Sequence, residues 1–169
     1  MTDQSQIITD WTNHPTGKIA TGEFCPHCGR YNARNSTATM LTTNAQNQVL
    51  LIKRKRDPQA GWWAMPGGYL DWNETLANCA KRELKEETGL AVENTTFLGI
   101  YDALDRDKDG RQNVDHCYVG RVIAPATLTL DSNEVIQAEW FSFDRLPDNI
   151  AFDHRQMLID YYHSLGTKD

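Results

Sequence analysis

The amino-acid sequence predicts an α/β protein, in which an α/β/α sandwich is built around a central mixed sheet. Segments with the composition of strands alternate with segments of helical periodicity, and this alternation is typical of the class. The turn signal Asn-Ala-Gln-Asn at residues 44–47 joins the first two predicted strands as a hairpin. At 169 residues, the chain is long enough for one domain with a sizeable core.

The predicted elements follow in a simple order. Strands are expected at residues 36–42, 48–53, 92–101, 114–123 and 135–143. A helix is expected at residues 75–88, and a charged loop at residues 102–113. A last helix begins at Asp153, with apolar residues at helical spacing: Met157, Leu158, Tyr161, Tyr162 and Leu165.

The helix at residues 75–88 has recognisable ends and one apolar face. Asn73 or Thr75 can cap its start by accepting from a backbone N–H that has no partner within the helix. Gly89 is expected to end it, because glycine enters the left-handed conformation without steric cost. The apolar stripe repeats every fourth residue, at Leu76, Ala80 and Leu84.

Three glutamates lie on this helix. Glu83 and Glu87 are neighbours at i, i+4, and Glu86 lies one step around the helix. Like charges at this spacing repel each other, and a hard cation that prefers oxygen ligands, Mg²⁺ or Mn²⁺, removes the repulsion. The alternative is a solvated acidic face that pairs with nearby basic residues: Lys81, Arg82 and Lys85.

The segment before the helix supplies further candidates. In a helical projection, Arg82 points away from Glu83 and Glu87, and Glu74 can reach it from the preceding loop as an ion-pair clamp. A glycine pair at residues 67–68 lets the backbone approach a bound metal, so the carbonyl of Gly67 is a candidate ligand.

Residues 68–90 match every fixed position of the Nudix box, G-x5-E-x7-R-E-U-x-E-E-x-G-U, where U is aliphatic. The chain therefore resembles the Nudix hydrolases. Residues 49–56, 61–68 and 139–141 resemble the family's strands around the box. The resemblance covers residues 36–165, and the domain is assigned to residues 36–169, preceded by an extension at residues 1–35.

The resemblance implies hydrolysis of a diphosphate bond in a nucleoside diphosphate derivative. The cofactor would be Mg²⁺ or Mn²⁺, which polarises phosphoryl oxygens and activates water. Glu83, Glu86 and Glu87 would be metal ligands, assisted by Gly67. Arg82 and Glu74 would support catalysis. The general base stays open between Glu86 and Glu134.

Two short segments bear on the substrate. Residues 151–154 (Ala-Phe-Asp-His) and residues 105–107 (Asp-Arg-Asp) resemble the small ADP-ribose pyrophosphatases. The preferred partner is therefore ADP-ribose or a nucleotide sugar, cleaved to a nucleoside monophosphate and a sugar phosphate. A pyrophosphatase for oxidised dNTPs is the alternative. A non-catalytic nucleotide-binding regulator is less favoured, because the box keeps its glutamates. Residues 152–153 also suit a simple helix start, with Asp153 as the N-cap and Phe152 as a staple.

Arginines are the candidate phosphate ligands, because a guanidinium binds phosphate with two donors. Strand alternation places Arg54 and Arg56 on one face, and Lys53 and Lys55 on the other. One of these pairs is expected to face the diphosphate, and the alternative is a solvated strand end. Arg106 is a further candidate in the charged loop, where Arg111 is also available.

Two cation sites are suggested outside the box. Cys25 and Cys28 form one Cys-x-x-Cys knuckle of a zinc ribbon whose second pair is missing, so bound Zn²⁺ is less favoured than a degenerate remnant. Residues 105–110 match the first half of a calcium loop, but position twelve is His116 instead of glutamate. A solvated acidic loop is the preferred interpretation.

The composition restricts the partners. A net charge of −6 argues against binding extended nucleic acid, which favours a basic surface. No apolar segment has the length of a membrane span, and residues 1–6 lack the features of a signal peptide, so a cytoplasmic location is expected. Whether the chain forms a homodimer is left open.

Overall fold

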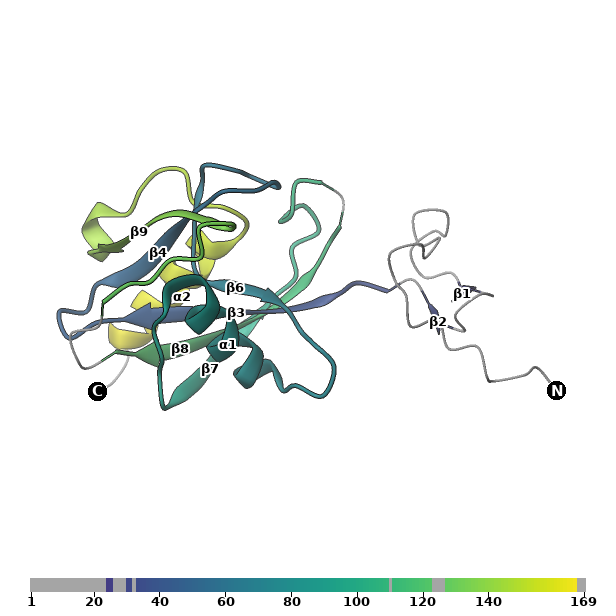
Figure 1. The fold of residues 1–169 in the computed structure, drawn as a ribbon, viewed down its shortest axis with the longest axis horizontal. Helices are drawn as coiled ribbons and strands as arrows, with labels where there is room; N and C mark the ends of the chain where they lie inside the picture. The colour runs from purple at the N-terminus through teal and green to yellow at the C-terminus, as the bar shows by residue number, and fades with distance from the viewer. Residues whose placement is uncertain (1–23, 26–29, 32, 110, 123–126, 167–169) are drawn as a thin grey trace. The chain divides into compact units, whose positions relative to one another are not determined.

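The computed structural model describes residues 24–25, 30–31, 33–109, 111–122 and 127–166 (Figure 1). The chain divides into two compact units, Met1–Arg34 and Asn35–Asp169. In the first unit, β1 (Phe24–Cys25) pairs antiparallel with β2 (Arg30–Tyr31). Cys28 and the side chain of Cys25 lie outside the described part of the chain, so the zinc hypothesis stays a prediction.

The second unit contains one sheet and two α-helices in the residues described. Its strands are β3 (Ser36–Thr43), β4 (Val49–Arg54), β5 (Trp63–Ala64), β6 (Gly67–Tyr69), β7 (Thr95–Tyr101), β8 (Val114–Arg121) and β9 (Val135–Phe141). Its helices are α1 (Leu76–Thr88), the 3₁₀ turn η3 (Phe143–Arg145) and α2 (His154–Gly166). None of the described helices has both the length and the apolar character of a membrane-spanning segment.

The sheet is mixed, as the sequence predicts. Its strand order is β5-β4-β3-β8-β7, with β3 parallel to β8 and the other described pairs antiparallel. β3 and β4 are paired at Thr43 and Val49, beside their hairpin turn. Further on, β3 pairs with β6 while β4 pairs with β5 and β9. The two strands therefore diverge beyond the hairpin turn.

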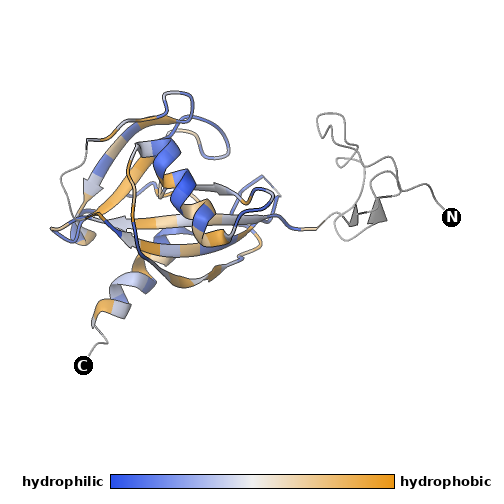
Figure 2. Ribbon diagram, turned by 60° about the horizontal axis from the view of Figure 1, so that its bottom comes forward, coloured by the Kyte–Doolittle hydropathy of each residue, from blue (hydrophilic) through white to orange (hydrophobic). Residues whose placement is uncertain are grey.

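Alternation along the strands builds a core on each face of the sheet. Met40 and Leu50 pack with α1 through Ala80 and Leu84. The next residues along the strands, Leu41 and Leu51, pack with α2 through Met157 and Leu158. Figure 2 shows the hydrophobic strands and the hydrophilic outer surface of α1. Helices thus cover both faces, which confirms the predicted α/β/α sandwich.

Most predicted boundaries hold within a few residues. Thr75 is the N-cap of α1 and accepts from the N–H of Asn78 at 3.3 Å, while Gly89 ends the helix at φ 74°. The strand expected at residues 61–68 is two strands, because β5 pairs with β4 and β6 pairs with β3. In α2, Tyr162 and Leu165 are exposed, although their spacing predicted an apolar face.

Candidate active site

A cleft of about 380 Å³ opens beside α1, and its lining comes from distant parts of the chain. β3, β4 and β6 provide its sheet side, and Glu83 and Glu87 line it from α1. The loop at residues 105–113 and the start of β8 provide another part of the lining. Glu134, Phe152 and the segment at residues 56–58 also contribute to the lining. The cleft therefore brings most of the predicted site residues into one enclosure.

The two cleft-facing glutamates are poorly solvated and repel each other. Glu87 is 7% exposed, and its Oε2 accepts from the N–H of Gly67 at 3.1 Å. Burial, reinforced by the charge of Glu83, raises the pKa of Glu87 well above its usual range. Burial also raises the pKa of Glu83, although Arg82 acts in the opposite direction. Such a pair is a natural binding site for a divalent cation.

Gly68 lies directly against Glu83. A Cβ atom at this position would overlap the Glu83 carboxylate. At Gly67, a Cβ atom would lie 2.7 Å from the carbonyl oxygen of Ala38. The glycine pair of the motif is therefore required because β6 passes too close to β3 and α1 for any side chain.

Arg82 connects the acidic residues of the box. Its Nε and Nη2 donate to the two carboxylate oxygens of Glu74 at 2.9 and 3.0 Å, so the expected ion pair forms. Its Nη1 donates to Glu83 at 2.7 Å and to Glu86 at 3.0 Å. The prediction that Arg82 points away from Glu83 is wrong, because its long side chain folds back along the helix surface.

The two candidate bases lie in different surroundings. The side chain of Glu86 is 58% exposed beside Arg82 and does not line the cleft. Glu134 does line the cleft, with a side chain that is 47% exposed and accepts from Nη1 of Arg56 at 3.2 Å. Only Glu134 of these two therefore faces the cleft in this structure.

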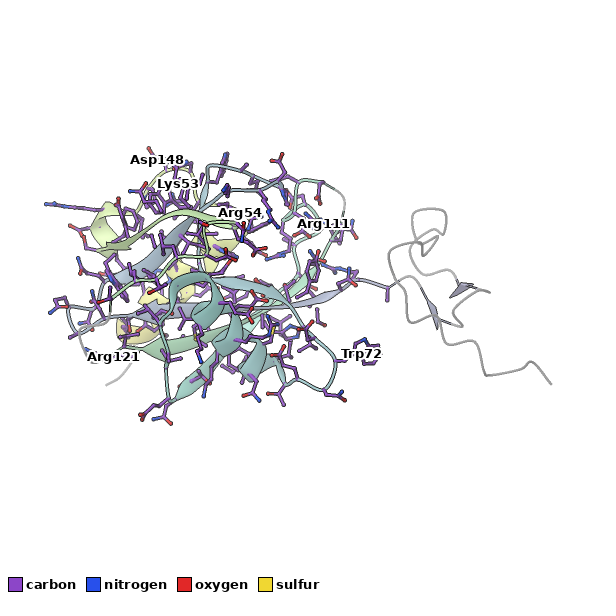
Figure 3. All side chains as sticks on the ribbon, viewed as in Figure 1. Lys53, Arg54, Trp72, Arg111, Arg121 and Asp148 are labelled. Carbon is purple, nitrogen blue, oxygen red and sulfur yellow. The ribbon has the colours of Figure 1, made fainter. Side chains whose placement is uncertain are left out.

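Strand alternation places the basic residues of β4 and its extension as expected. Arg54 and Arg56 line the cleft. Lys53 lies over the ring of Trp63, and Lys55 donates to the carbonyl of Ser132. Burial lowers the pKa of Arg54, and nearby Arg111 adds to this effect while Glu87 opposes it. Arg54 and Arg111 are labelled in Figure 3.

Arg106 borders the cleft, but its side chain is buried and held by carboxylates. It is 4% exposed and forms ion pairs with Asp107 at 3.1 Å, Asp115 at 3.0 Å and Asp153 at 3.0 Å. Its donors are used by these carboxylates, which argues against the expected role as a phosphate ligand. Arg111 also lines the cleft and its side chain is 40% exposed, so this loop still offers a guanidinium.

The calcium-loop interpretation fails on geometry. Asp107 faces Arg106, while Asp105 pairs with Lys108 at 3.0 Å and Asp109 pairs with Arg111 at 2.7 Å. The three carboxylates point to different cations of their own loop and do not converge. The loop is therefore braced by ion pairs, partly buried and partly solvated.

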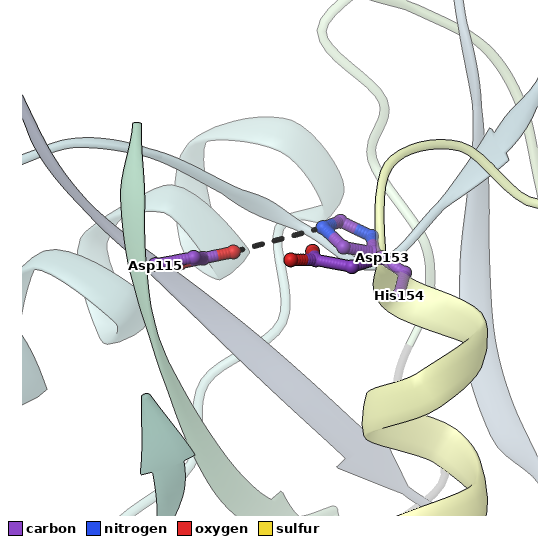
Figure 4. A group of neighbouring side chains, drawn as sticks. All are labelled: Asp115, Asp153 and His154. Atoms are coloured by element: carbon purple, nitrogen blue, oxygen red, sulfur yellow. Dashed lines mark ion pairs between the residues drawn. The ribbon is translucent and has the colours of Figure 1, made fainter. Parts of the chain in front are cut away.

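Asp115, Asp153 and His154 form a buried cluster that sequence reasoning missed (Figure 4). Their ligand atoms lie within 4.8 Å of one another. His154 accepts from the N–H of Met65 through Nδ1 at 3.0 Å, and its Nε2 lies 3.7 Å from Asp115. Arg106 already places positive charge between the two aspartates, so we assign no metal here. Only the fold brings these residues together.

The glutamates of α1 fit a divalent metal better. They offer hard oxygen donors, as Mg²⁺ and Mn²⁺ require, and no cation other than Arg82 pairs with Glu83 among the described residues. Glu83 and Glu87 could hold the ion from the cleft. Glu86 could join them once its exposed side chain turns from Arg82 towards the ion.

Comparison with known proteins identifies the family. The family model described as NUDIX domain matches residues 33–161. An ADP-ribose pyrophosphatase of Methanocaldococcus jannaschii is 38% identical over 115 residues, which are 68% of this chain and 66% of that protein. A Bacillus subtilis protein provisionally named an 8-oxo-dGTP diphosphatase is 28% identical over 78% of this chain and 81% of its own length.

Solved structures agree with the family model. The crystal structure of a MutT NUDIX hydrolase from Burkholderia pseudomallei superposes with a TM-score of 0.67 at 30% identity. The match covers 75% of this chain and 96% of that one. The box residues, the mixed sheet and these matches agree, and the chain belongs to the Nudix family of hydrolases.

Proposed function

We propose that the protein hydrolyses the diphosphate bond of a nucleoside diphosphate linked to a sugar, with ADP-ribose as the preferred substrate. The products are a nucleoside monophosphate and a sugar phosphate. One observation carries the proposal: the buried Glu87 and the partly buried Glu83, which repel each other, share a cleft with Arg54 and Arg56. The glutamates can bind a cation and the arginines can bind an anion, so the cleft suits a metal-bound diphosphate. The name of the M. jannaschii relative supports the choice of substrate.

Glu83 and Glu87, with Glu86 and the carbonyl of Gly67, would hold Mg²⁺ or Mn²⁺. When bound, the ion polarises a phosphoryl oxygen and makes water a better nucleophile. The N–H of Gly67 keeps the Glu87 carboxylate in place through its 3.1 Å hydrogen bond. Arg82, anchored by Glu74, holds Glu83 and Glu86 near the site.

Arg54 and Arg56 would bind the non-bridging oxygens of the diphosphate. Their guanidinium groups offer paired donors to phosphate. Glu134 lines the same cleft and bonds to Arg56, so we favour it as the proton acceptor over the outward-facing Glu86. A variant Glu134→Gln should then lower kcat by roughly 10²- to 10⁴-fold, whereas Glu86→Gln should mainly weaken metal binding.

A second candidate is the pyrophosphatase of oxidised dNTPs, favoured by the similarity to the B. subtilis protein. It requires the same metal site, so the box residues do not separate the two substrates. A nucleotide-binding regulator without catalysis is less favoured, because Glu83, Glu86 and Glu87 are all retained.

The deciding experiment is a substrate panel with Mg²⁺, with Mn²⁺ and with EDTA. The panel contains ADP-ribose, NADH, a dinucleoside polyphosphate and oxidised and normal dNTPs, with products identified by chromatography. We expect metal-dependent release of AMP and ribose 5-phosphate, with ADP-ribose having the highest kcat/KM. Faster cleavage of an oxidised dNTP would transfer the assignment to the second candidate. Absence of turnover with either metal would overturn the proposal.

A further inference from the structure

Phe152 has an unusual backbone conformation at the edge of the cleft. Its φ is +57°, in the left-handed region that bulky residues rarely adopt. Gln59, which follows β4, has a φ of +61°. Such conformations persist where surrounding contacts enforce them, and they cluster at functional sites. We therefore looked for the contacts that hold Phe152 and Gln59 in this conformation.

The side chain of Gln59 holds this arrangement together. Its Oε1 accepts from the N–H of Phe152 at 3.0 Å, and its Nε2 donates to the carbonyl of Arg106 at 3.4 Å. These two bonds join segments that are 93 and 47 residues apart in sequence. One amide thus ties the segment after β4 to the start of α2 and to the charged loop.

The ring of Phe152 contacts two guanidinium groups with different surroundings. The Cζ of Arg54 lies 4.7 Å from the ring centroid, and the Cζ of Arg106 lies 5.4 Å from it. Arg106 forms ion pairs with Asp107, Asp115 and Asp153, and these four residues are called the buried ionic cluster. Arg54 donates to the carbonyls of Pro58 and Arg56, and none of the described carboxylates forms a salt bridge with it.

An aromatic face stabilises a cation without using its N–H donors. A carboxylate in the same place would neutralise Arg54 and compete with a phosphate for its donors. Nη1 of Arg54 has no hydrogen-bond partner in the described structure, so it stays available to a ligand in the cleft. The Phe152 ring can therefore fix the position of the Arg54 guanidinium and leave an N–H donor for an anion.

We propose that Phe152 is a positioning residue, whose ring sets the Arg54 guanidinium for binding a phosphoryl oxygen of the substrate. Gln59 keeps the ring in place by holding its backbone in the left-handed conformation. The inference rests on the proposed function, because it takes the ligand of Arg54 to be a diphosphate. The competing explanation is that Phe152 only covers the buried Arg106 cluster, which predicts a change in stability alone.

A double-mutant cycle separates these explanations, using the substrate that the wild type cleaves fastest. Phe152→Leu should raise KM roughly threefold to tenfold, the size of one partly buried cation–π contact, with kcat nearly unchanged. Phe152→Tyr should restore KM, because it keeps the aromatic face. In an Arg54→Ala background, Phe152→Leu should change KM no further. Unchanged KM in Phe152→Leu, or independent effects that multiply, would overturn the proposal.

A second measurement does not depend on turnover. The Nε–H resonance of Arg54 should show a ring-current shift in the wild type that Phe152→Leu and Gln59→Asn remove and Phe152→Tyr keeps. Asparagine tolerates the left-handed conformation but is too short to reach both partners of Gln59. Phe97→Leu is the matched control, because Phe97 packs against Tyr118 in a tilted arrangement outside the cleft.

The two proposals fail separately. If the wild type hydrolyses nothing in the panel, the proposed function is lost, and the Arg54 resonance alone decides whether the ring sets the guanidinium. If the enzyme is active but the Arg54 resonance is the same in Phe152→Leu, the positioning role is lost and the proposed function stands.

Discussion

Glu87 shows how one residue combines several constraints. It is buried, it faces the charge of Glu83, and it accepts a hydrogen bond from Gly67. A carboxylate in such a position is unfavourable by itself and becomes favourable once a divalent ion shares it. The burial and charge of Glu87 therefore suit the metal-ligand role that we propose for it.

Glu87→Gln is expected to lower kcat at least tenfold while the fold survives. The change removes a metal ligand, but the amide oxygen can still accept from Gly67. The kcat at saturating Mn²⁺ tests the loss of activity, and urea unfolding in EDTA tests whether the fold survives. Glu93→Gln, at an exposed position, is the control. Wild-type activity in Glu87→Gln would remove it from the metal site.

Arg106 stabilises the fold through its ion pairs with three aspartates. Arg106→Ala should destabilise the protein by about 3–5 kcal/mol, because it leaves buried carboxylates without their cation. The KM of the folded protein should change little, and Arg106→Lys, which keeps a charge, should be less destabilised. A raised KM with unchanged unfolding would return Arg106 to the substrate-binding residues.

Among the elements, β6 and α1 form the site together. The glycine pair lets β6 run close enough to α1 for Gly67 to bond Glu87 and for Gly68 to lie against Glu83. Thr75 and Gly89 fix the ends of α1, and so determine which turn of the helix presents the glutamates. The motif is thus one contact surface between a strand and a helix.

Gly68→Ala should weaken Mn²⁺ binding and lower activity at least tenfold, because its Cβ would displace the Glu83 carboxylate. Mn²⁺ titration followed by electron paramagnetic resonance measures the affinity directly. The control is Gly166→Ala at the end of α2, where a Cβ would contact nothing within 4 Å. Equal Mn²⁺ affinities for both variants would refute this role of Gly68.

The buried ionic cluster joins the charged loop, β8 and α2. Burial acts to raise the pKa of Asp115, but His154, Arg106 and Thr39 hold it below its usual value. A lowered pKa means that ionised Asp115 stabilises the fold above its unfolded pKa, and that this contribution is lost as the pH falls through the folded value.

The difference in free energy of unfolding between wild type and Asp115→Asn should therefore be largest at pH 7 and should decrease below about pH 4. Urea unfolding of both proteins from pH 3 to pH 7 measures it. Thr39→Val, which removes one donor to Asp115 at 2.6 Å, should produce a smaller change of the same sign. A difference that stays constant across this range would contradict the assignment.

For the whole molecule, the described residues that line the cleft lie between positions 37 and 152, within the unit Asn35–Asp169. A chain of residues 35–169 should therefore fold alone and keep the Tm and kcat/KM of the full protein. Thermal unfolding and steady-state kinetics of the two chains test this. Loss of the folded state on truncation would show that residues 1–34 contribute to the domain.

The sequence predicted the fold class, α1 with both its ends, the arginine face of β4 and the acidic residues of the box. These features depend on local periodicity, on capping and on spacing along one element, which the sequence records directly. The prediction for Arg82 was wrong, because a helical projection gives only the direction of the Cα–Cβ bond. It takes no account of how a long, flexible side chain folds back along the helix.

Only the tertiary structure decided which polar residues meet. In the folded protein, Arg106 forms ion pairs with three aspartates. Glu134 lines the cleft, whereas Glu86 does not. The fold also stacks Phe152 on Arg54, which is 98 positions away in sequence. The physical reason is that ion pairs and ring contacts depend on distances in space between separate elements. The pairing of strands sets those distances, and no spacing within a single element contains them.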